Sequence, residues 1–179
     1  RIHDVEPKGK SASLGVVHRI DKETSGLIVF ARTFVALQRL SSQFREHSIE
    51  RKYYAIAHGK VKGRTVETRI ARDNGSGIRG SVPAGKFNAA GEELGRRAVT
   101  HFEVVEELEG ATLVACRLET GRTHQIRIHL SEIGHPIIGE KVYIKDFQGE
   151  PIPANRVMLH AAELGFLHPE TGDQVMWKQ

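Results

Sequence analysis

Length, composition and charge exclude several classes of protein. The chain has 179 residues, of which 39% are hydrophobic and 27% are charged, values that suit a globular protein and neither a disordered nor a fibrous one. Apolar runs such as residues 27–31 fall far short of the roughly 20 residues that span a membrane. We therefore expect one soluble domain over residues 1–179, with a formal net charge of +4.

The first half of the chain predicts strands around one helix. Residues 1–14 are polar and rich in Gly, Ser and Lys, and we interpret them as a loose lead-in. A strand is predicted over residues 27–31. Apolar residues then recur at helical spacing over residues 34–44, which predicts an amphipathic helix. Two further strands are expected over residues 53–57 and 66–70, where apolar and polar residues alternate.

The middle of the chain predicts a long connection and a hairpin. Residues 74–97 carry many glycines and one proline, which indicates a flexible connection without regular structure. Residues 98–105 and 112–118 both alternate at period two, and the acidic residues 106–110 between them predict a turn.

The last part of the chain predicts one helix and a strand pair. A helix is expected to begin near Thr123 and to end at Gly134, with apolar residues along one face. Residues 157–161 and 164–167 are predicted as a closing strand pair, followed by a turn over residues 168–172. Because strands outnumber helices and hairpins link most of them, we expect an α+β fold with a mixed, largely antiparallel sheet flanked by helices.

The single cysteine bears on the compartment. Cys116 has no partner for an intrachain disulfide and lies in an apolar alternation, so we interpret it as a buried thiol. No charged-then-apolar leader precedes the first predicted element. Both observations favour the reducing cytoplasm.

The charge of the chain is unevenly distributed. Residues 51–86 contain nine Lys or Arg residues against two acids, and glutamates gather just beyond them. A basic face of this kind is typical of proteins that bind polyanions such as nucleic acid. A solvated basic surface without a ligand is the alternative, and charge alone does not decide between them.

The first candidate site surrounds one carboxylate. Asp21 stands between Arg19 and Lys22, and the positive charge on both sides favours an ionised carboxylate. An ionised and oriented Asp can act as a nucleophile or as a general base. The alternative is an ordinary loop acceptor that caps a turn.

The second candidate site lies over residues 118–129. Arg122, His124 and Arg127 surround a glycine turn and the start of the predicted helix, where the helix N-terminus adds partial positive charge, so we expect an anion site. Arg127 is predicted to be half-buried and to need a carboxylate partner, for which Asp21 is the candidate. A surface helix start with unpaired arginines is the alternative.

The histidines do not predict a metal site. His124 and His129 are separated by roughly 140° around a helix, so they cannot face one ion together, and no cysteine pair or His-Glu-x-x-His pattern is present. The two tyrosines of the strand 53–57 are expected to point to opposite faces, so that one of them is free to stack on a base.

Four ordered motifs together resemble a known family. They are H-R-I-D-K-E-T-S-G at residues 18–26, R-x-Y-x-A-x-A-x-G at residues 51–59, T-G-R-T-H-Q-I-R-I-H at residues 120–129 followed by G-H-P-I-I-G, and the closing L-H-A and H-P at residues 159–161 and 168–169. This set is similar to that of the pseudouridine synthases of the ribosomal large-subunit type. The likeness covers nearly the whole chain.

The resemblance implies roles for individual residues. Asp21 matches the catalytic aspartate that detaches uracil from its ribose and rejoins it through C5, and Arg127 matches the basic residue that pairs with it. Tyr53 matches the aromatic that stacks on the uracil, and Arg19 the arginine that occupies the space left by a flipped base. Arg122 and His124 are expected to contact the substrate. The family needs no cofactor, and the sequence signals none.

The resemblance also implies the partner and leaves rivals open. We expect a monomeric pseudouridine synthase of structured RNA, ribosomal RNA ahead of transfer RNA. Members of the family usually begin with a strand carrying K-P-x-G, and some relatives carry a small N-terminal RNA-binding module. Neither precedes the aspartate motif here, so a catalytic domain lacking that strand is expected. The rivals are a catalytically silent RNA-binding or ribosome-assembly module and a hydrolase of the uridine glycosidic bond, in which water completes the reaction.

Overall fold

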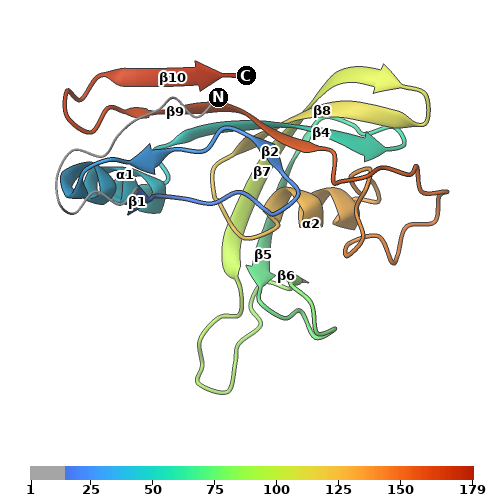
Figure 1. The fold of residues 1–179 in the computed structure, drawn as a ribbon. Helices are drawn as coiled ribbons and strands as arrows, with labels where there is room; N and C mark the ends of the chain where they lie inside the picture. The colour runs from blue at the N-terminus through green and yellow to red at the C-terminus, as the bar shows by residue number, and fades with distance from the viewer. Residues whose placement is uncertain (1–14) are drawn as a thin grey trace.

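The computed structural model describes residues 15–179, so the predicted lead-in lies outside the described residues. Figure 1 shows one large twisted sheet with two helices and a projecting arm. The elements in chain order are β1 (Gly15–Val16), β2 (Ser25–Gly26), β3 (Phe30–Ala31), α1 (Phe34–Glu46), β4 (Glu50–His58), β5 (Arg64–Ala71), β6 (Gly80–Val82), β7 (Arg96–Leu108), β8 (Ala111–Leu118), α2 (Gln125–Glu132), β9 (Leu159–Leu167) and β10 (Gln174–Lys178).

The large sheet confirms the predicted α+β fold. Its strands follow the order β10-β9-β4-β8-β7-β5-β6, and every neighbouring pair in that order is antiparallel. The short β2 pairs with β9 in parallel, which makes the sheet mixed. The predicted hairpin is confirmed as β7 and β8, with a tighter turn than expected because β7 continues to Leu108.

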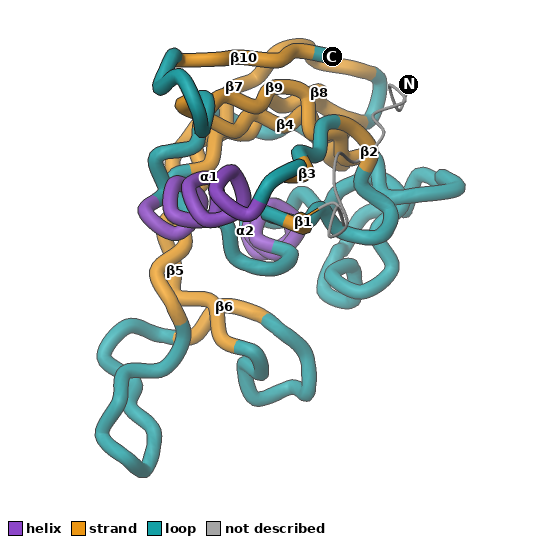
Figure 2. The backbone as a smooth tube through the Cα atoms, turned by 60° about the vertical axis from the view of Figure 1, so that its left-hand side comes forward, coloured by secondary structure: helices purple, strands orange, loops and turns teal. Residues whose placement is uncertain are grey.

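Both helices lie on the same side of this sheet (Figures 1 and 2). Helix α1 confirms the predicted amphipathic helix. Its N-cap is Thr33, whose hydroxyl accepts from the backbone N–H of Ala36 at 3.1 Å. Leu40 packs against β9, whereas Phe34, which the pattern had placed on the apolar face, is 71% exposed.

Helix α2 confirms the predicted apolar face but starts later than expected. Ile126 and Leu130 are buried against β4 and β8, in a core cluster that includes Cys116. His124 has a left-handed backbone (φ 60°), so the helix begins at Gln125 and not near Thr123. Cys116 is fully buried, as predicted.

Three predictions about strands were wrong. Residues 27–31 form only the short β3 at their end, because residues 27–29 leave the sheet after the backbone N–H of Leu27 donates to Ala161 O. Residues 157–161 and 164–167 are not a strand pair: residues 159–167 are the continuous strand β9, since no turn residue interrupts them and they pair along β4 and β10. Residues 74–97 contain β6, paired with β5, and so are not wholly irregular.

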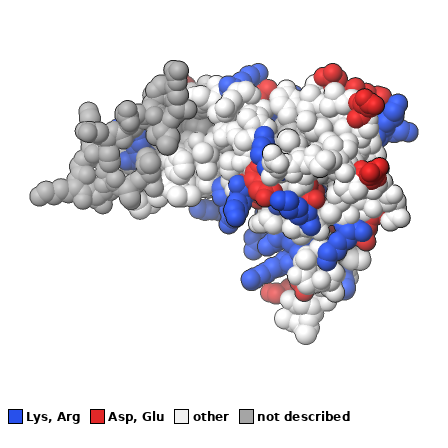
Figure 3. Space-filling view, turned by 45° about the vertical axis from the view of Figure 1, so that its right-hand side comes forward, with Lys and Arg blue, Asp and Glu red and all other residues white. Residues whose placement is uncertain are grey.

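The basic residues of 51–86 do not all lie free on one surface. Arg51 points into a pocket, Lys52 pairs with Glu163 at 3.3 Å, and Arg69 pairs with Glu93 at 3.1 Å. In Figure 3, Lys and Arg side chains instead gather where the arm of β5, β6 and their loops joins the body.

None of the helices in residues 15–179 has the length and apolar character that a membrane crossing requires.

Candidate functional site

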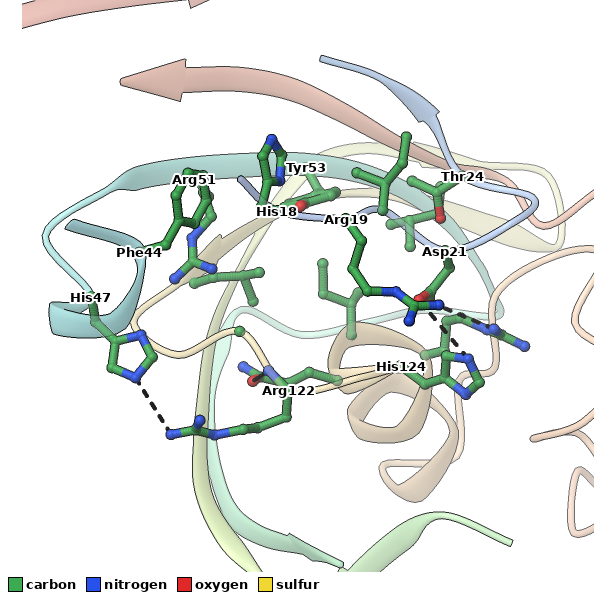
Figure 4. A pocket seen from close by; sticks show the side chains of 17 residues that line it. His18, Arg19, Asp21, Thr24, Phe44, His47, Arg51, Tyr53, Arg122 and His124 are labelled. Atoms are coloured by element: carbon green, nitrogen blue, oxygen red, sulfur yellow. Dashed lines mark hydrogen bonds and ion pairs between the residues drawn. The ribbon is translucent and has the colours of Figure 1, made fainter. Parts of the chain in front are cut away.

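A cavity of about 280 Å³ opens between the loop before β2, the end of α1, strand β4 and the turn before α2 (Figure 4). It gathers motifs that lie more than 100 residues apart in the sequence. All six site residues predicted from the sequence line this cavity: Arg19, Asp21, Tyr53, Arg122, His124 and Arg127. The fold therefore brings the two candidate sites together into one.

Backbone contacts hold Asp21 in place. The N–H of Thr24 donates to the Asp21 carbonyl at 2.9 Å, which closes a turn. Two residues later, Gly26 (φ 109°) pairs with Ala161 in β9, so closely that a Cβ on Gly26 would overlap the Ala161 backbone. Because only glycine fits there, the Asp21 loop is tied directly to the central sheet.

Arg127 holds two carboxylates at once. Its Nη1 lies 3.6 Å from Asp21 Oδ2, so the predicted pair exists as an ion pair. Its closer partner is Glu140, which accepts from Nε at 2.7 Å and from Nη2 at 2.8 Å. The Glu140 side chain is fully buried, and its Oε1 also accepts from the backbone N–H of Val142 at 2.8 Å. Sequence reasoning missed Glu140, although it directly follows the G-H-P-I-I-G motif.

The charges in this group stabilise one another. Burial acts to lower the pKa of Arg127, but the hydrogen bonds and charge of Glu140, together with the charge of Asp21, outweigh it and raise that pKa. Burial acts to raise the pKa of Glu140, but bonds from Arg127 and from backbone N–H groups outweigh it and lower that pKa. Arg127 is therefore a fixed cation that faces Asp21.

His124 borders the same group without forming a strong ion pair. Its Nδ1 is 2.8 Å from the Tyr143 hydroxyl, and its Nε2 is 3.9 Å from Asp21 Oδ1, beyond hydrogen-bond distance. Burial lowers the pKa of His124 and Arg127 lowers it further, against an opposing effect of Asp21. We therefore treat His124 as neutral at pH 7, able to donate or accept a hydrogen bond at the edge of the cavity.

Tyr53 and Tyr54 point to opposite faces of β4, as predicted. Tyr53 lines the cavity and packs against the core cluster under α2. Burial raises its pKa, against an opposing effect of Arg51, so the hydroxyl stays protonated. Tyr54 instead lies beside Lys52, whose Nζ is 4.9 Å from its ring centroid. Tyr53 is thus the aromatic that is available to a ligand.

Basic groups gather at the other end of the cavity, away from Asp21 (Figure 4). Arg122 donates from Nε to the Arg97 carbonyl at 2.9 Å and from Nη2 to His47 Nε2 at 3.4 Å. Arg51 lies beside them, with its guanidinium carbon 6.0 Å from the Phe44 ring centroid. Sequence reasoning placed Arg51 in the motif over residues 51–59 and in a basic stretch but assigned it no role in the site, and it missed His47. At the rim, Arg19 is exposed.

His129, the histidine within α2, is part of the buried core. His129 is fully buried between the hydroxyls of Thr100 and Thr68, at 2.9 and 3.0 Å. Within residues 15–179, no group of three or more His, Cys, Asp or Glu side chains is arranged to hold a metal ion.

Comparisons with known proteins agree on one family. Residues 2–132 match the family model described as RNA pseudouridylate synthase. The chain is 44% identical to a Zymomonas mobilis protein named ribosomal large subunit pseudouridine synthase D, over 93% of this chain and 52% of that protein. It is 35% identical to the Escherichia coli K12 protein of the same name, over 98% of this chain and 55% of that protein. The chain thus spans about half the length of these curated relatives.

A solved structure agrees as well. The structure titled human RNA pseudouridylate synthase domain containing 1 superposes with a TM-score of 0.77 at 26% sequence identity. The superposition covers 93% of this chain and 69% of that one. The match therefore extends across nearly all of the fold described above.

Proposed function

The chain belongs to the RNA pseudouridylate synthase family, and on this premise we propose that it converts particular uridines of structured RNA into pseudouridine. Ribosomal RNA is the proposed substrate, ahead of transfer RNA, because the similar bacterial proteins are named as enzymes of the ribosomal large subunit. The observation that carries the proposal is the Asp21 carboxylate, which lies 3.6 Å from Arg127 and lines the same cavity as Tyr53. The cytoplasm remains the expected compartment.

The proposed reaction exchanges one bond for another. The bond from N1 of uracil to C1′ of ribose breaks, the ring turns, and a bond from C5 to C1′ forms. The C5 proton is released and N1 gains a proton, so the reaction needs neither an oxidant nor net water. Asp21 acts as the nucleophile, which adds to C1′ or to C6 and leaves again at the end, and thereby divides a difficult exchange into easier steps.

The surrounding residues have separate proposed roles. Arg127 orients Asp21, because the position of Arg127 is itself fixed by Glu140. Tyr53 stacks on the uracil after the base has left the RNA stack, which costs a few kcal/mol. Arg19, at the rim, fills the space that the base leaves, while Arg122 and His124 contact the nucleotide.

The test is release of tritium from RNA that carries C5-labelled uridine. We expect the native chain to release tritium without free uracil and Asp21→Asn to be slower by at least about 1,000-fold, since a nucleophile cannot be replaced by its amide. Asp146→Asn is the matched control, because Asp146 is an exposed carboxylate outside the cavity, and it should keep the native rate. Thermal unfolding of each variant checks that the fold is intact.

Other outcomes point to the two rival functions. Free uracil in the reaction mixture would identify a glycosidic-bond hydrolase, because water would then replace C5 as the acceptor of C1′. RNA binding by all three proteins without tritium release would identify a binding module. Either result overturns the proposed isomerase.

A further inference from the structure

At the end of the cavity farthest from Asp21, two nitrogens of the Arg51 guanidinium are buried without a partner among the described residues. Within residues 15–179, Nε and Nη2 of Arg51 are buried and have no hydrogen-bond acceptor. Buried polar groups in proteins nearly always have a partner, and an unpaired buried charge is costly. The Phe44 ring at 6.0 Å is at the outer limit of a cation–π contact and does not replace an acceptor.

His47 adds a second unpaired donor. A guanidinium can only donate, so the 3.4 Å contact from Arg122 Nη2 requires His47 Nε2 to accept, which leaves the proton on Nδ1. This Nδ1 is also buried and has no partner among the described residues. Burial lowers the pKa of His47, and the charges of Arg122 and Arg51 lower it further, which favours the neutral ring.

Among the described residues that line the cavity, no carboxylate lies at the end that holds Arg51 and Arg122. Asp21 is the sole carboxylate among these described residues, and Figure 4 shows it at the opposite end from Arg51 and Arg122. Burial lowers the pKa of Arg51; the charge of Tyr53 acts to raise this pKa, and the charge of Arg122 acts to lower it. Two cations and one neutral donor thus converge without an anion.

The turn before α2 makes room for this arrangement. A Cβ on Gly121 would overlap Arg51 Nη1, so the guanidinium lies in the space that any other residue would fill. The backbone φ of Gly121 is not in the left-handed region, so backbone conformation does not explain the glycine. The glycine instead leaves this space open to the flexible end of the Arg51 side chain.

We propose that Arg51, Arg122 and the Nδ1–H of His47 form a subsite for one backbone phosphate of the bound RNA, next to the nucleotide whose base faces Asp21. This inference rests on the proposed function, because it assumes that the uridine lies over Tyr53. The unpaired nitrogens are closed to solvent in the free protein, so the side chains must shift for a phosphate oxygen to accept from them. Arginine suits phosphate because its planar fork can donate two hydrogen bonds. The subsite would fix the ribose so that C1′ lies near Asp21.

A direct test is a binding measurement that needs no turnover. The Nε–H signal of Arg51, identified by its absence in Arg51→Lys, is followed by NMR while uridine, uridine 5′-monophosphate and uridine 3′-monophosphate are added at constant ionic strength. We expect one of the monophosphates, and not uridine, to shift this signal saturably. No greater shift with either monophosphate than with uridine would overturn the subsite.

A second test exploits the cost of the unpaired charge. In the Asp21→Asn background, Arg51→Met should bind ribosomal RNA about tenfold more weakly, because it loses one charge-assisted hydrogen bond to the phosphate. The slope of log affinity against log salt should fall by about one. Without RNA, Arg51→Met should melt at the same or a higher temperature, because an uncompensated charge is removed. A lower melting temperature with unchanged affinity would show a structural arginine and contradict the proposal.

A matched control and a rescue variant complete the design. Arg117 lies on the neighbouring strand β8, is exposed, and follows the buried Cys116, so its side chain points to the other face of the sheet. Arg117→Met should therefore leave affinity and salt slope unchanged. Arg51→Lys keeps the charge and should recover part of the affinity. Equal losses for Arg117→Met and Arg51→Met would indicate a general charge effect and overturn the subsite.

The two proposals can fail separately. Tritium release by the native chain, with no monophosphate shift at Arg51, would leave the isomerase standing and remove the subsite. A monophosphate shift at Arg51 with no tritium release would keep the phosphate subsite and remove the isomerase.

Discussion

The two ends of the cavity differ in how their charges are balanced. At one end, Arg127 lies between Asp21 and the buried Glu140, so each charge has a partner before any ligand binds. At the other end, Arg51 and Arg122 have no carboxylate partner among the residues that line the cavity. The charges at the Asp21 end are therefore paired in the free protein, whereas the Arg51 end has no anion among the residues that line the cavity.

This difference separates two tasks. A group that reacts must be held in one geometry at all times, because its alignment determines the rate. A group that binds gains more when its partner is missing in the free protein, since the ligand then relieves an existing cost. The comparison predicts that mutations of the buried Arg127–Glu140 pair damage the fold and the rate together, and that mutations at the Arg51 end damage binding alone.

The largest expected effect is at Glu140. In Glu140→Gln, the buried Arg127 keeps only Asp21, the more distant of its two carboxylate partners. Removing one partner of a buried ion pair lowers the free energy of unfolding by about 3–5 kcal/mol. Turnover should fall more than RNA affinity, because Arg127 then no longer holds Asp21 in place. Denaturant unfolding and tritium release measure the two effects.

An exposed pair provides the matched control for Glu140. Glu67 also binds an arginine with both oxygens, at 2.8 and 3.2 Å from Arg97, but both side chains are about half exposed. Glu67→Gln should cost less than about 1 kcal/mol and leave the rate unchanged. Equal costs for the two variants would mean that burial of Glu140 does not matter, and the contrast between the ends would lose its basis.

A smaller effect is expected at Gly26, which ties the Asp21 loop to the sheet. Gly26→Ala forces a Cβ against the backbone of Ala161, so we expect a loss of about 2–4 kcal/mol and a lower rate. Gly75→Ala is the control: Gly75 has a similar φ of 103°, but an added Cβ meets no atom within 4 Å. Its cost should be that of the strained backbone alone, about 1–2 kcal/mol. Similar melting temperatures for both variants would show that the close approach at Ala161 is unimportant.

The sequence predicted the residues of the cavity better than their partners. Asp21 and Arg127 were predicted as a pair because a half-buried arginine needs a carboxylate. Glu140 was missed because it lies in an irregular segment, and nothing in the sequence around it indicates that its side chain is buried. Its role depends on tertiary packing that a local pattern does not contain.

Arg51 was misjudged for a related reason. Alternation along β4 distinguishes two faces, but it does not say which face carries the cavity, and the pairing of β4 with β9 also shifts register between Lys52 and Tyr53. Strand β9 was divided in two because its apolar runs were read as separate strands. The α+β class, by contrast, followed from the hairpins and helices, which local patterns do encode.

The smallest expected effect compares two histidines. His18 and His129 both have pKa values lowered to about 4, and burial is the main cause for each. Only His18 feels the charge of Arg51, which lowers its pKa further. Arg51→Gln should therefore raise the pKa of His18 and leave that of His129 unchanged, as measured by pH titration of the two imidazole NMR signals.

The lowered pKa values of the two histidines also make the stability of the fold depend on pH. Each histidine is neutral in the folded protein and takes up its proton near pH 6.5 when unfolded, so its contribution is complete above pH 6.5 and is lost as the pH falls toward about 4. Arg51→Gln should make this loss less steep, and His129→Gln should remove a separate part of it. An unchanged pKa at His18 would mean that the charge of Arg51 is already compensated in the free protein, and the two ends of the cavity would then be alike.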